Sequence, residues 1–249
     1  MEPDQAVTRP GTLYGVGLGP GDPDLMTVKA HRLIAAARVI AYPAPDDGPS
    51  FARSIAADLI PEDAREIPII VPMRVERFPA QAVYDRAAEE IAAELAAGAN
   101  VVTLCEGDPF FYGSFMYLFE RLVDRFACEI VPGVTSLTAC AARLRRPLTA
   151  RTDVLTVIPG PLPDEEIRAR IEAAGAVAIM KVGRHLPRLK RLLGEMGLLD
   201  RAGYVERATL ASERVLPLAE AGEAGAPYFS MILLYKGEEA WMLPPRSSS

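Results

Sequence analysis

The chain has 249 residues, and half of them are hydrophobic, which is enough for one large core or two modest ones. Asp and Glu number 33 against 27 Lys and Arg, so the net charge is −6 at pH 7. With no block of like charge, a general nucleic-acid surface is disfavoured. The three cysteines form no CxxC pair and only two histidines occur, so we expect neither a disulfide framework nor a metal site.

The N-terminal stretch MEPDQAVTRPG has no apolar core and carries an early acidic residue, which argues against a signal peptide. No apolar run approaches the ~20 residues that a membrane-spanning helix needs. Three reduced thiols are typical of a protein in a reducing compartment. We therefore expect a cytoplasmic location and no membrane partner.

Strand-like and helical runs alternate through the first half of the chain. Strands are predicted at residues 12–18, 38–42, 66–72 and 100–105, the second of them stopped by Pro43 and Pro45. Helices are predicted from Pro23 to about residue 37, with Asp22 as the N-cap, and then at 50–59, 82–97 and 114–124. Because most of these strands are apolar throughout, they predict a mainly parallel sheet that is covered on both faces.

The second half follows a similar pattern. Helices are predicted at residues 134–144 and 163–175, and a third follows the strand at 176–183 and runs to about residue 196. A further helix is possible around Ala219. Strands are predicted at 153–160, 176–183 and 228–237, and two more between 201 and 218. We therefore predict an α/β protein of two α/β domains, at residues 11–132 and 133–244, with a cofactor cleft between them.

A glycine-rich stretch, GVGLGPGDPDLMT, follows the first predicted strand. It starts like a dinucleotide-binding GxGxxG motif, but its sixth position is Pro20 and the next strand lacks the usual acidic residue. A second bare turn, EGDPFFYG, places Glu106 and Asp108 at the carboxyl end of another strand, where α/β sheets bind ligands. Neither turn has a phosphate-binding lysine. These turns suit a ligand with hydroxyls and an amine but no phosphate, and S-adenosylmethionine fits that description.

The segments GVGLGPGDPDLMT, EGDPFFYG and VPGVTS resemble the three signature segments of the tetrapyrrole methyltransferases of cobalamin and sirohaem biosynthesis. They stand in the expected order and spacing, and the similarity covers roughly residues 11–238. Within the family, EGDPFFYGSFMYLFERL and YPAP are most similar to the enzymes that methylate C20 of precorrin-2. The uroporphyrinogen enzymes have a loop of the type GGDPFxFGRGGEE, from which this chain departs at Glu106, Tyr112, Ser114, Phe115 and Met116.

The resemblance implies a homodimer that uses S-adenosylmethionine. It also implies cofactor contacts from the residues that match the family's motifs: Pro20, Glu106, Gly107, Asp108, Phe111, Thr135, Ser136, Met180, Lys181, Phe229 and Ser230. The tetrapyrrole substrate carries eight carboxylates, which arginines recognise well. The candidate substrate-binding residues are Arg74, Arg77, Arg146 and Arg184. For each of them, a solvated surface charge is the competing interpretation.

The implied reaction is methyl transfer to C20 of precorrin-2, a small-molecule substrate. The sequence does not identify the group that removes the C20 proton, although Tyr112 and His185 are the candidates. Cobalt-factor II or another precorrin position is an alternative target. A nicotinamide-dependent oxidoreductase and an RNA-modifying relative are the alternatives of other classes, and the missing ribose-binding acid and the acidic balance count against them.

Overall fold

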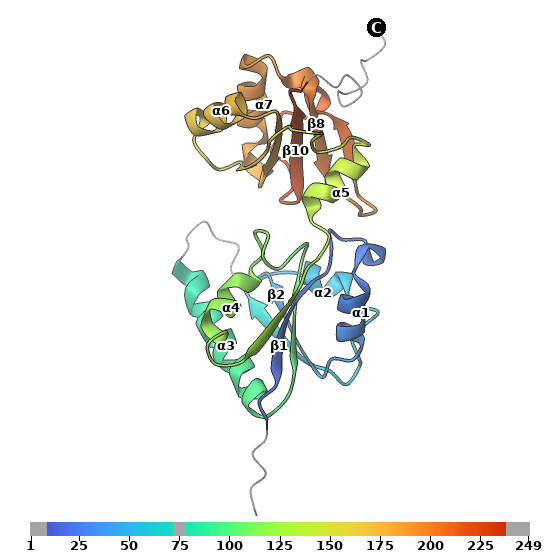
Figure 1. Cartoon of the computed structure of the whole chain (residues 1–249), viewed down its shortest axis with the longest axis vertical. Coiled ribbons are helices and arrows are strands. Elements are labelled where there is room, and N and C mark those ends of the chain that lie inside the picture. The colour runs from blue at the N-terminus through green and yellow to red at the C-terminus, as the bar shows by residue number, and fades with distance from the viewer. Residues whose placement is uncertain (1–8, 72–77, 238–249) are drawn as a thin grey trace, which may run out of the picture. The chain divides into compact units, whose positions relative to one another are not determined.

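The computed structural model describes residues 9–71 and 78–237 (Figure 1). The chain divides into two compact units, the first ending at Thr135 and the second beginning at Ser136. The sequence-based boundary lies after residue 132. Within the described residues, no helix combines the length and the apolar character that crossing a lipid bilayer requires.

The first unit is built on a five-stranded sheet in the order β3-β2-β4-β1-β5. Its strands are β1 (Thr12–Gly17), β2 (Val39–Ala44), β3 (Arg65–Ile70), β4 (Val101–Cys105) and β5 (Ala127–Val131). Every neighbouring pair is parallel. The prediction of a parallel sheet from the apolar strands is therefore confirmed for this unit.

Helices cover both faces of this first sheet. They are α1 (Val28–Ala35), α2 (Phe51–Ile55), α3 (Phe78–Ala96) and α4 (Phe115–Leu122), with a short 3₁₀ turn η1 (Pro23–Leu25). Helices α1 and α2 pack on the face that carries Val16 and Leu104. Helices α3 and α4 pack on the opposite face, against Leu13 and Val101. Figure 1 shows α1 and α2 on one side of β1 and α3 and α4 on the other.

The second unit has its own five-stranded sheet, in the order β6-β7-β10-β8-β9. Its strands are β6 (Leu155–Pro159), β7 (Ala176–Met180), β8 (Ala202–Glu206), β9 (Arg214–Pro217) and β10 (Ser230–Tyr235). Only β6 and β7 are parallel, because β10 runs antiparallel to β7 and β8, and β9 antiparallel to β8. The helical segments are α5 (Ser136–Arg143), α6 (Asp164–Ala173) and α7 (Leu186–Glu195), with 3₁₀ turns η2 (Gly183–His185), η3 (Leu199–Arg201) and η4 (Leu218–Glu220).

The start of the first helix differs from the prediction. Asp22 does cap a turn, accepting a hydrogen bond from the Asp24 backbone N–H, but that turn is only the 3₁₀ segment Pro23–Leu25. The α-helix begins after Thr27, whose Oγ1 accepts from the Ala30 N–H at 3.1 Å. Asp22 and Thr27 are both cap residues and stand five positions apart, and the α-helix uses the second of them.

Of the two prolines predicted to stop the second strand, Pro43 instead lies within β2, opposite Ile69 of β3. The strand ends at Ala44, directly before Pro45. The pairing of β2 with β4 extends only from Val39 to Ala41. Beyond Ala41 the strand has one paired neighbour, β3, and a residue without an N–H costs fewer ladder hydrogen bonds there.

Candidate functional site

The three glycine-bearing segments leave the carboxyl ends of three adjacent strands. β1 lies between β4 and β5, and the register pairs Gly17 with Cys105 and Val16 with Val131. In a parallel sheet all carboxyl ends meet at one edge, so the loops after β1, β4 and β5 lie side by side. The two glycine turns are therefore neighbours, and the VPGVTS segment lies beside them.

The loops after β1 and β4 are joined through their backbones. The Gly107 N–H donates to the Gly19 carbonyl at 2.7 Å, and the Gly19 N–H donates to the Gly107 carbonyl at 3.2 Å. This isolated antiparallel bridge lies just beyond the ends of the two parallel strands. It fixes the relative position of the two turns without any side chain.

The glycines of these loops serve two different purposes. A Cβ at Gly133 would lie 2.0 Å from the Gly107 carbonyl oxygen, and one at Gly17 would lie 2.6 Å from the Gly133 nitrogen. Gly17 and Gly133 are therefore required by close packing of backbone on backbone. Gly107 has a φ of +66°, and a Cβ there would meet nothing within 4 Å. The open space beside Gly107 is where a ligand can approach bare backbone.

Asp108 ties the loop after β4 to itself and to the loop after β5. Its Oδ1 accepts a hydrogen bond from the Phe110 N–H at 2.9 Å. Its Oδ2 accepts one from the Gly133 N–H at 3.0 Å. Both oxygens of this carboxylate thus have a backbone donor within the first unit.

Glu106 is a partly buried acid at the carboxyl end of β4. Burial raises the pKa of its carboxyl group, and hydrogen bonds from the backbone of Glu106 and Ala52 oppose that shift. Ala52 lies in the first turn of α2. The acid therefore sits at the carboxyl edge of the sheet in an environment that favours its neutral form.

Other predicted site residues of the first unit lie in the same three loops. Phe111 is half-buried, and its ring meets the ring of Tyr112 edge to face, with the centroids 5.2 Å apart. Tyr112 is 43% exposed and has a φ of +57°, which is uncommon for a bulky residue and typical of functional loops. Pro20 and Thr135 are half-buried.

The predicted cofactor contacts of the second unit gather at one edge of its sheet. Met180 ends β7 and pairs with Met231, next to Ser230 at the start of β10. Lys181 follows with a φ of +56°, and Phe229 is exposed beside Ser230. The structure therefore brings these four residues together, although Ser136, at the start of α5, belongs to another element.

Arg184 and His185 lie in η2, directly after that strand end. The Ala226 N–H donates to the Gly183 carbonyl at 2.9 Å, which holds this turn beside the segment leading to Phe229. Burial lowers the pKa of His185, and the positive charges of Arg188 and Arg184 lower it further. His185 is thus neutral near pH 7 and can accept a proton, while Arg184 is exposed.

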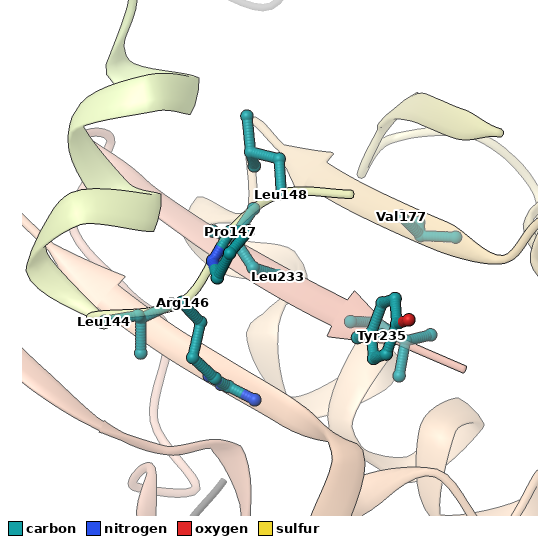
Figure 2. Close-up of a pocket in the computed structure, with 8 residues that line it drawn as sticks. Leu144, Arg146, Pro147, Leu148, Val177, Leu233 and Tyr235 are labelled. Atoms are coloured by element: carbon teal, nitrogen blue, oxygen red, sulfur yellow. The ribbon is translucent and has the colours of Figure 1, made fainter. Parts of the chain in front are cut away.

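Arg146 follows α5 and packs over the second sheet. Figure 2 shows it among residues of the segment after α5 and of strands β7 and β10. The hollow that these residues line has a volume of about 10 Å³, room for one water molecule at most. Its guanidinium lies so close to the sheet that a Cβ at Gly203 would be 2.4 Å from Nη2. Burial lowers the pKa of Arg146.

Arg146 also stands apart from the other candidates of its unit. Gly203 pairs with Leu233, three residues along β10 from Ser230, which is about 10 Å at 3.3 Å per residue. Arg74 and Arg77 lie outside the described residues. Among the residues that are described, no group of three or more His, Cys, Asp or Glu side chains is placed to hold a metal ion.

A buried polar group at the same edge of the second sheet escaped the sequence analysis. Glu206 is only 6% exposed and accepts a hydrogen bond from the Tyr204 hydroxyl at 2.8 Å. Arg214 on β9 pairs with it at 3.3 Å, and Glu206 lies opposite Ser230 in the strand register. The available signal was a charged residue ending an otherwise apolar strand, with an arginine eight residues later.

The family model for Tetrapyrrole (Corrin/Porphyrin) Methylases matches residues 12–222. The chain belongs to this family. The precorrin-2 C(20)-methyltransferase of a Sinorhizobium species is 42% identical over 232 residues, which cover 90% of the chain and 95% of that protein. The uroporphyrin-III C-methyl transferase of Thermus thermophilus, solved in complex with S-adenyl homocysteine, matches with a TM-score of 0.65 and 26% identity. That match covers 91% of this tetrapyrrole methylase and 98% of the Thermus chain.

A longer relative also matches this tetrapyrrole methylase. The cobalamin biosynthesis protein CobIJ of Mycobacterium tuberculosis is 44% identical over 241 residues, or 94% of the chain. Those residues are 47% of CobIJ, so the chain spans about half the length of that relative. The two-unit α/β fold predicted for the chain is the fold of this family.

Proposed function

We propose that the chain is an S-adenosylmethionine-dependent methyltransferase that acts on C20 of precorrin-2 in cobalamin biosynthesis. The observation that carries this proposal is the meeting of three glycine-bearing loops at one edge of a parallel sheet. It occurs in a chain that is 42% identical to a precorrin-2 C(20)-methyltransferase. The Thermus relative, solved with S-adenyl homocysteine, supports the choice of cofactor.

The loops of the first unit fit such a cofactor chemically. The space beside Gly107 admits a ligand to the backbone, where N–H and C=O groups can bind an adenine or an amino acid. Glu106 and Asp108 flank this glycine and offer acceptors for hydroxyl or ammonium groups. The described parts of the EGDPFFYG and GVGLGPGDP loops contain no lysine or arginine, in keeping with a ligand that lacks phosphate.

The bound cofactor supplies an activated methyl group, so the work of this chain is to bind and orient. The proposed cofactor contacts are those expected from the family's motifs: Pro20, Glu106, Gly107, Asp108, Phe111, Thr135, Ser136, Met180, Lys181, Phe229 and Ser230. For removing the C20 proton, His185 is favoured over Tyr112, because its lowered pKa keeps it neutral at physiological pH.

Exposed Arg184 is the candidate among the described residues that is best placed to bind a substrate carboxylate. Arg146, which lies over the sheet beside a hollow of about 10 Å³, is the weaker candidate. Arg74 and Arg77 remain sequence-based proposals. We further propose a cytoplasmic homodimer, as the resemblance implies; the three cysteines are free thiols, which suits a reducing compartment. Light scattering of the purified chain tests the dimer.

A thermal-shift panel tests the cofactor class. S-adenosylhomocysteine should raise the unfolding temperature, because a ligand at 100 times its Kd stabilises the folded state by about 2.7 kcal/mol. NAD should leave it unchanged. A shift with NAD and none with S-adenosylhomocysteine would overturn the methyltransferase proposal in favour of an oxidoreductase.

A methyl-transfer assay tests the substrate and the position. Precorrin-2 and cobalt-factor II are each incubated with the enzyme and S-adenosylmethionine carrying a ¹³C-labelled methyl group. We expect one new methyl resonance, assigned to C20 of the metal-free substrate. A label at any other carbon would contradict C20 specificity, and turnover of the cobalt compound alone would replace the proposed substrate with that one.

A further inference from the structure

Three loops converge at the carboxyl edge of the first sheet, but they are not held together in the same way. The loops after β1 and β4 share two backbone hydrogen bonds, between Gly19 and Gly107. The loops after β4 and β5 are joined by a side chain, since the Gly133 N–H donates to Asp108 Oδ2 at 3.0 Å. Among the described residues, the carboxylate of Asp108 therefore links the third loop to the second.

Side-chain packing cannot replace that bond where the loops touch. Gly17, Gly107 and Gly133 have no side chains, and their backbones approach so closely that a Cβ at Gly133 would lie 2.0 Å from the Gly107 oxygen. Such a contact buries little apolar surface, so hydrogen bonds must supply the attraction. A charged acceptor makes the stronger kind of hydrogen bond.

The second oxygen of Asp108 holds its own loop in shape. Oδ1 accepts from the Phe110 N–H at 2.9 Å, the side-chain turn that Asp forms with the residue two positions on. Asp108 is therefore oriented by Phe110 while it holds Gly133. The geometry requires both oxygens at once, which an asparagine cannot provide, because its amide nitrogen is not an acceptor.

We propose that Asp108 is a positioning residue, which clamps the loop after β5 to the loop after β4 and so presents the backbone of both to the cofactor. This inference rests on the proposed function. In this role Asp108 acts through its hydrogen bonds to Phe110 and Gly133, which form whether or not it also contacts the ligand. Thr135, another proposed cofactor contact, lies two residues beyond Gly133 in the same loop.

Amide hydrogen exchange in the protein without added ligand tests the clamp directly. In Asp108→Ala both acceptors are lost, and we expect the Gly133 and Phe110 amides to exchange about tenfold faster or more, since hydrogen bonds to charged groups contribute that much. In Asp108→Asn one acceptor oxygen remains, so at least one of the two amides should exchange faster. Unchanged exchange at Gly133 in Asp108→Ala would overturn the proposal.

Calorimetric binding of two ligands separates positioning from direct contact with the amino-acid part of the cofactor. S-adenosylhomocysteine has that part, and 5′-methylthioadenosine lacks it. If Asp108 acts by positioning, Asp108→Asn should weaken both ligands by a similar factor, roughly tenfold. A loss confined to S-adenosylhomocysteine would show that Asp108 acts on the amino-acid part alone and does not position the loops, which would contradict the proposal.

Asp153→Asn is the matched control, because Asp153 also accepts a backbone hydrogen bond, from the Ala150 N–H at 3.4 Å, but in the second unit. It should leave Gly133 exchange and both affinities unchanged. If Asp108→Ala does not fold, Asp108→Asn carries the exchange test, and its failure to speed either amide would overturn the clamp. If the wild-type protein binds neither nucleoside, the proposed function fails, whereas the exchange result still decides the role of Asp108 in joining the loops.

Discussion

The two units are both α/β and both contain a five-stranded sheet, but they bring residues to one edge in different ways. In the first unit every pair is parallel, so β4, β1 and β5 all deliver their carboxyl ends to the same edge. In the second unit β10 is antiparallel to β7 and β8. The edge of the second sheet that carries the predicted cofactor contacts therefore combines the ends of β7 and β8 with the beginning of β10. In a parallel sheet, one edge carries only the loops that follow strands. In an antiparallel sheet, the same edge carries both the ends of some strands and the beginnings of others.

The units also treat buried polar groups differently. In the first unit the Thr103 hydroxyl, on the central strand β4, is 2% exposed and has no hydrogen-bond partner among the described residues. In the second unit buried Glu206 is satisfied by Tyr204 and Arg214. The Thr103 hydroxyl thus lacks a partner, whereas the Glu206 carboxylate has two. Substitutions can test this difference.

The largest effect is expected from Gly133→Ala. The new Cβ would overlap the Gly107 oxygen, and overpacking of this kind costs about 3 kcal/mol of unfolding free energy, the upper end of the usual range. Urea denaturation measures the loss. Gly222→Ala is the control, because a Cβ there meets nothing within 4 Å, and it should change stability by less than about 0.5 kcal/mol. Equal effects of the two variants would show that the glycine contacts do not limit packing.

A smaller loss is expected from Tyr204→Phe in the second unit. It removes the donor to Glu206 and leaves a buried carboxylate with one partner fewer, which should cost about 2 kcal/mol. Tyr117→Phe, at an exposed position, should be close to neutral. If Tyr204→Phe were also neutral, Arg214 alone would satisfy Glu206.

The opposite sign is expected from Thr103→Val in the first unit. Valine has a similar shape and removes a buried hydroxyl that lacks a partner, so stability should rise by about 1 kcal/mol. Thr149→Val is the control, since the Thr149 hydroxyl donates to the Asp153 carbonyl at 3.1 Å and its loss should destabilise. A loss of stability in both variants would show that the Thr103 hydroxyl is satisfied in solution.

The smallest effect is expected from Glu106→Gln, and it depends on pH. Burial raises the pKa of Glu106 in the folded protein, so the unfolded chain loses this proton at lower pH than the folded one. The contribution of the neutral acid is therefore full below the ordinary pKa of about 4.3 and is lost as pH rises through the raised value. The melting temperature of Glu106→Gln, relative to wild type, should increase between pH 4 and pH 8.

Glu120→Gln is the control for Glu106→Gln, because its side chain is 78% exposed and it reports the effect of removing a surface charge. A difference between Glu106→Gln and wild type that falls with rising pH would mean that a positive group near Glu106 outweighs its burial.

Much of the fold was predictable because hydrophobic runs report burial locally. The apolar strands of the first unit predicted a parallel sheet covered on both faces, and the structure confirms it. The predicted start of α1 was wrong, because it depends on which of two cap residues the helix uses. The predicted extent of β2 was wrong, because it depends on where the pairing with β4 stops. The roles of the individual site residues stay predictions.

By itself, the sequence determined that strands and helices alternate, that bare turns follow two of the predicted strands, and that the chain resembles one family. Only the tertiary structure decided that neighbouring backbone occupies the space where a Cβ of Gly17 or Gly133 would lie, while the corresponding space at Gly107 is open. It also decided that Arg146 lies over a sheet and that Arg214 pairs with Glu206. The physical reason is that periodicity records how each segment meets its surroundings, whereas contacts between loops depend on strand order, which is set by crossovers between distant parts of the chain.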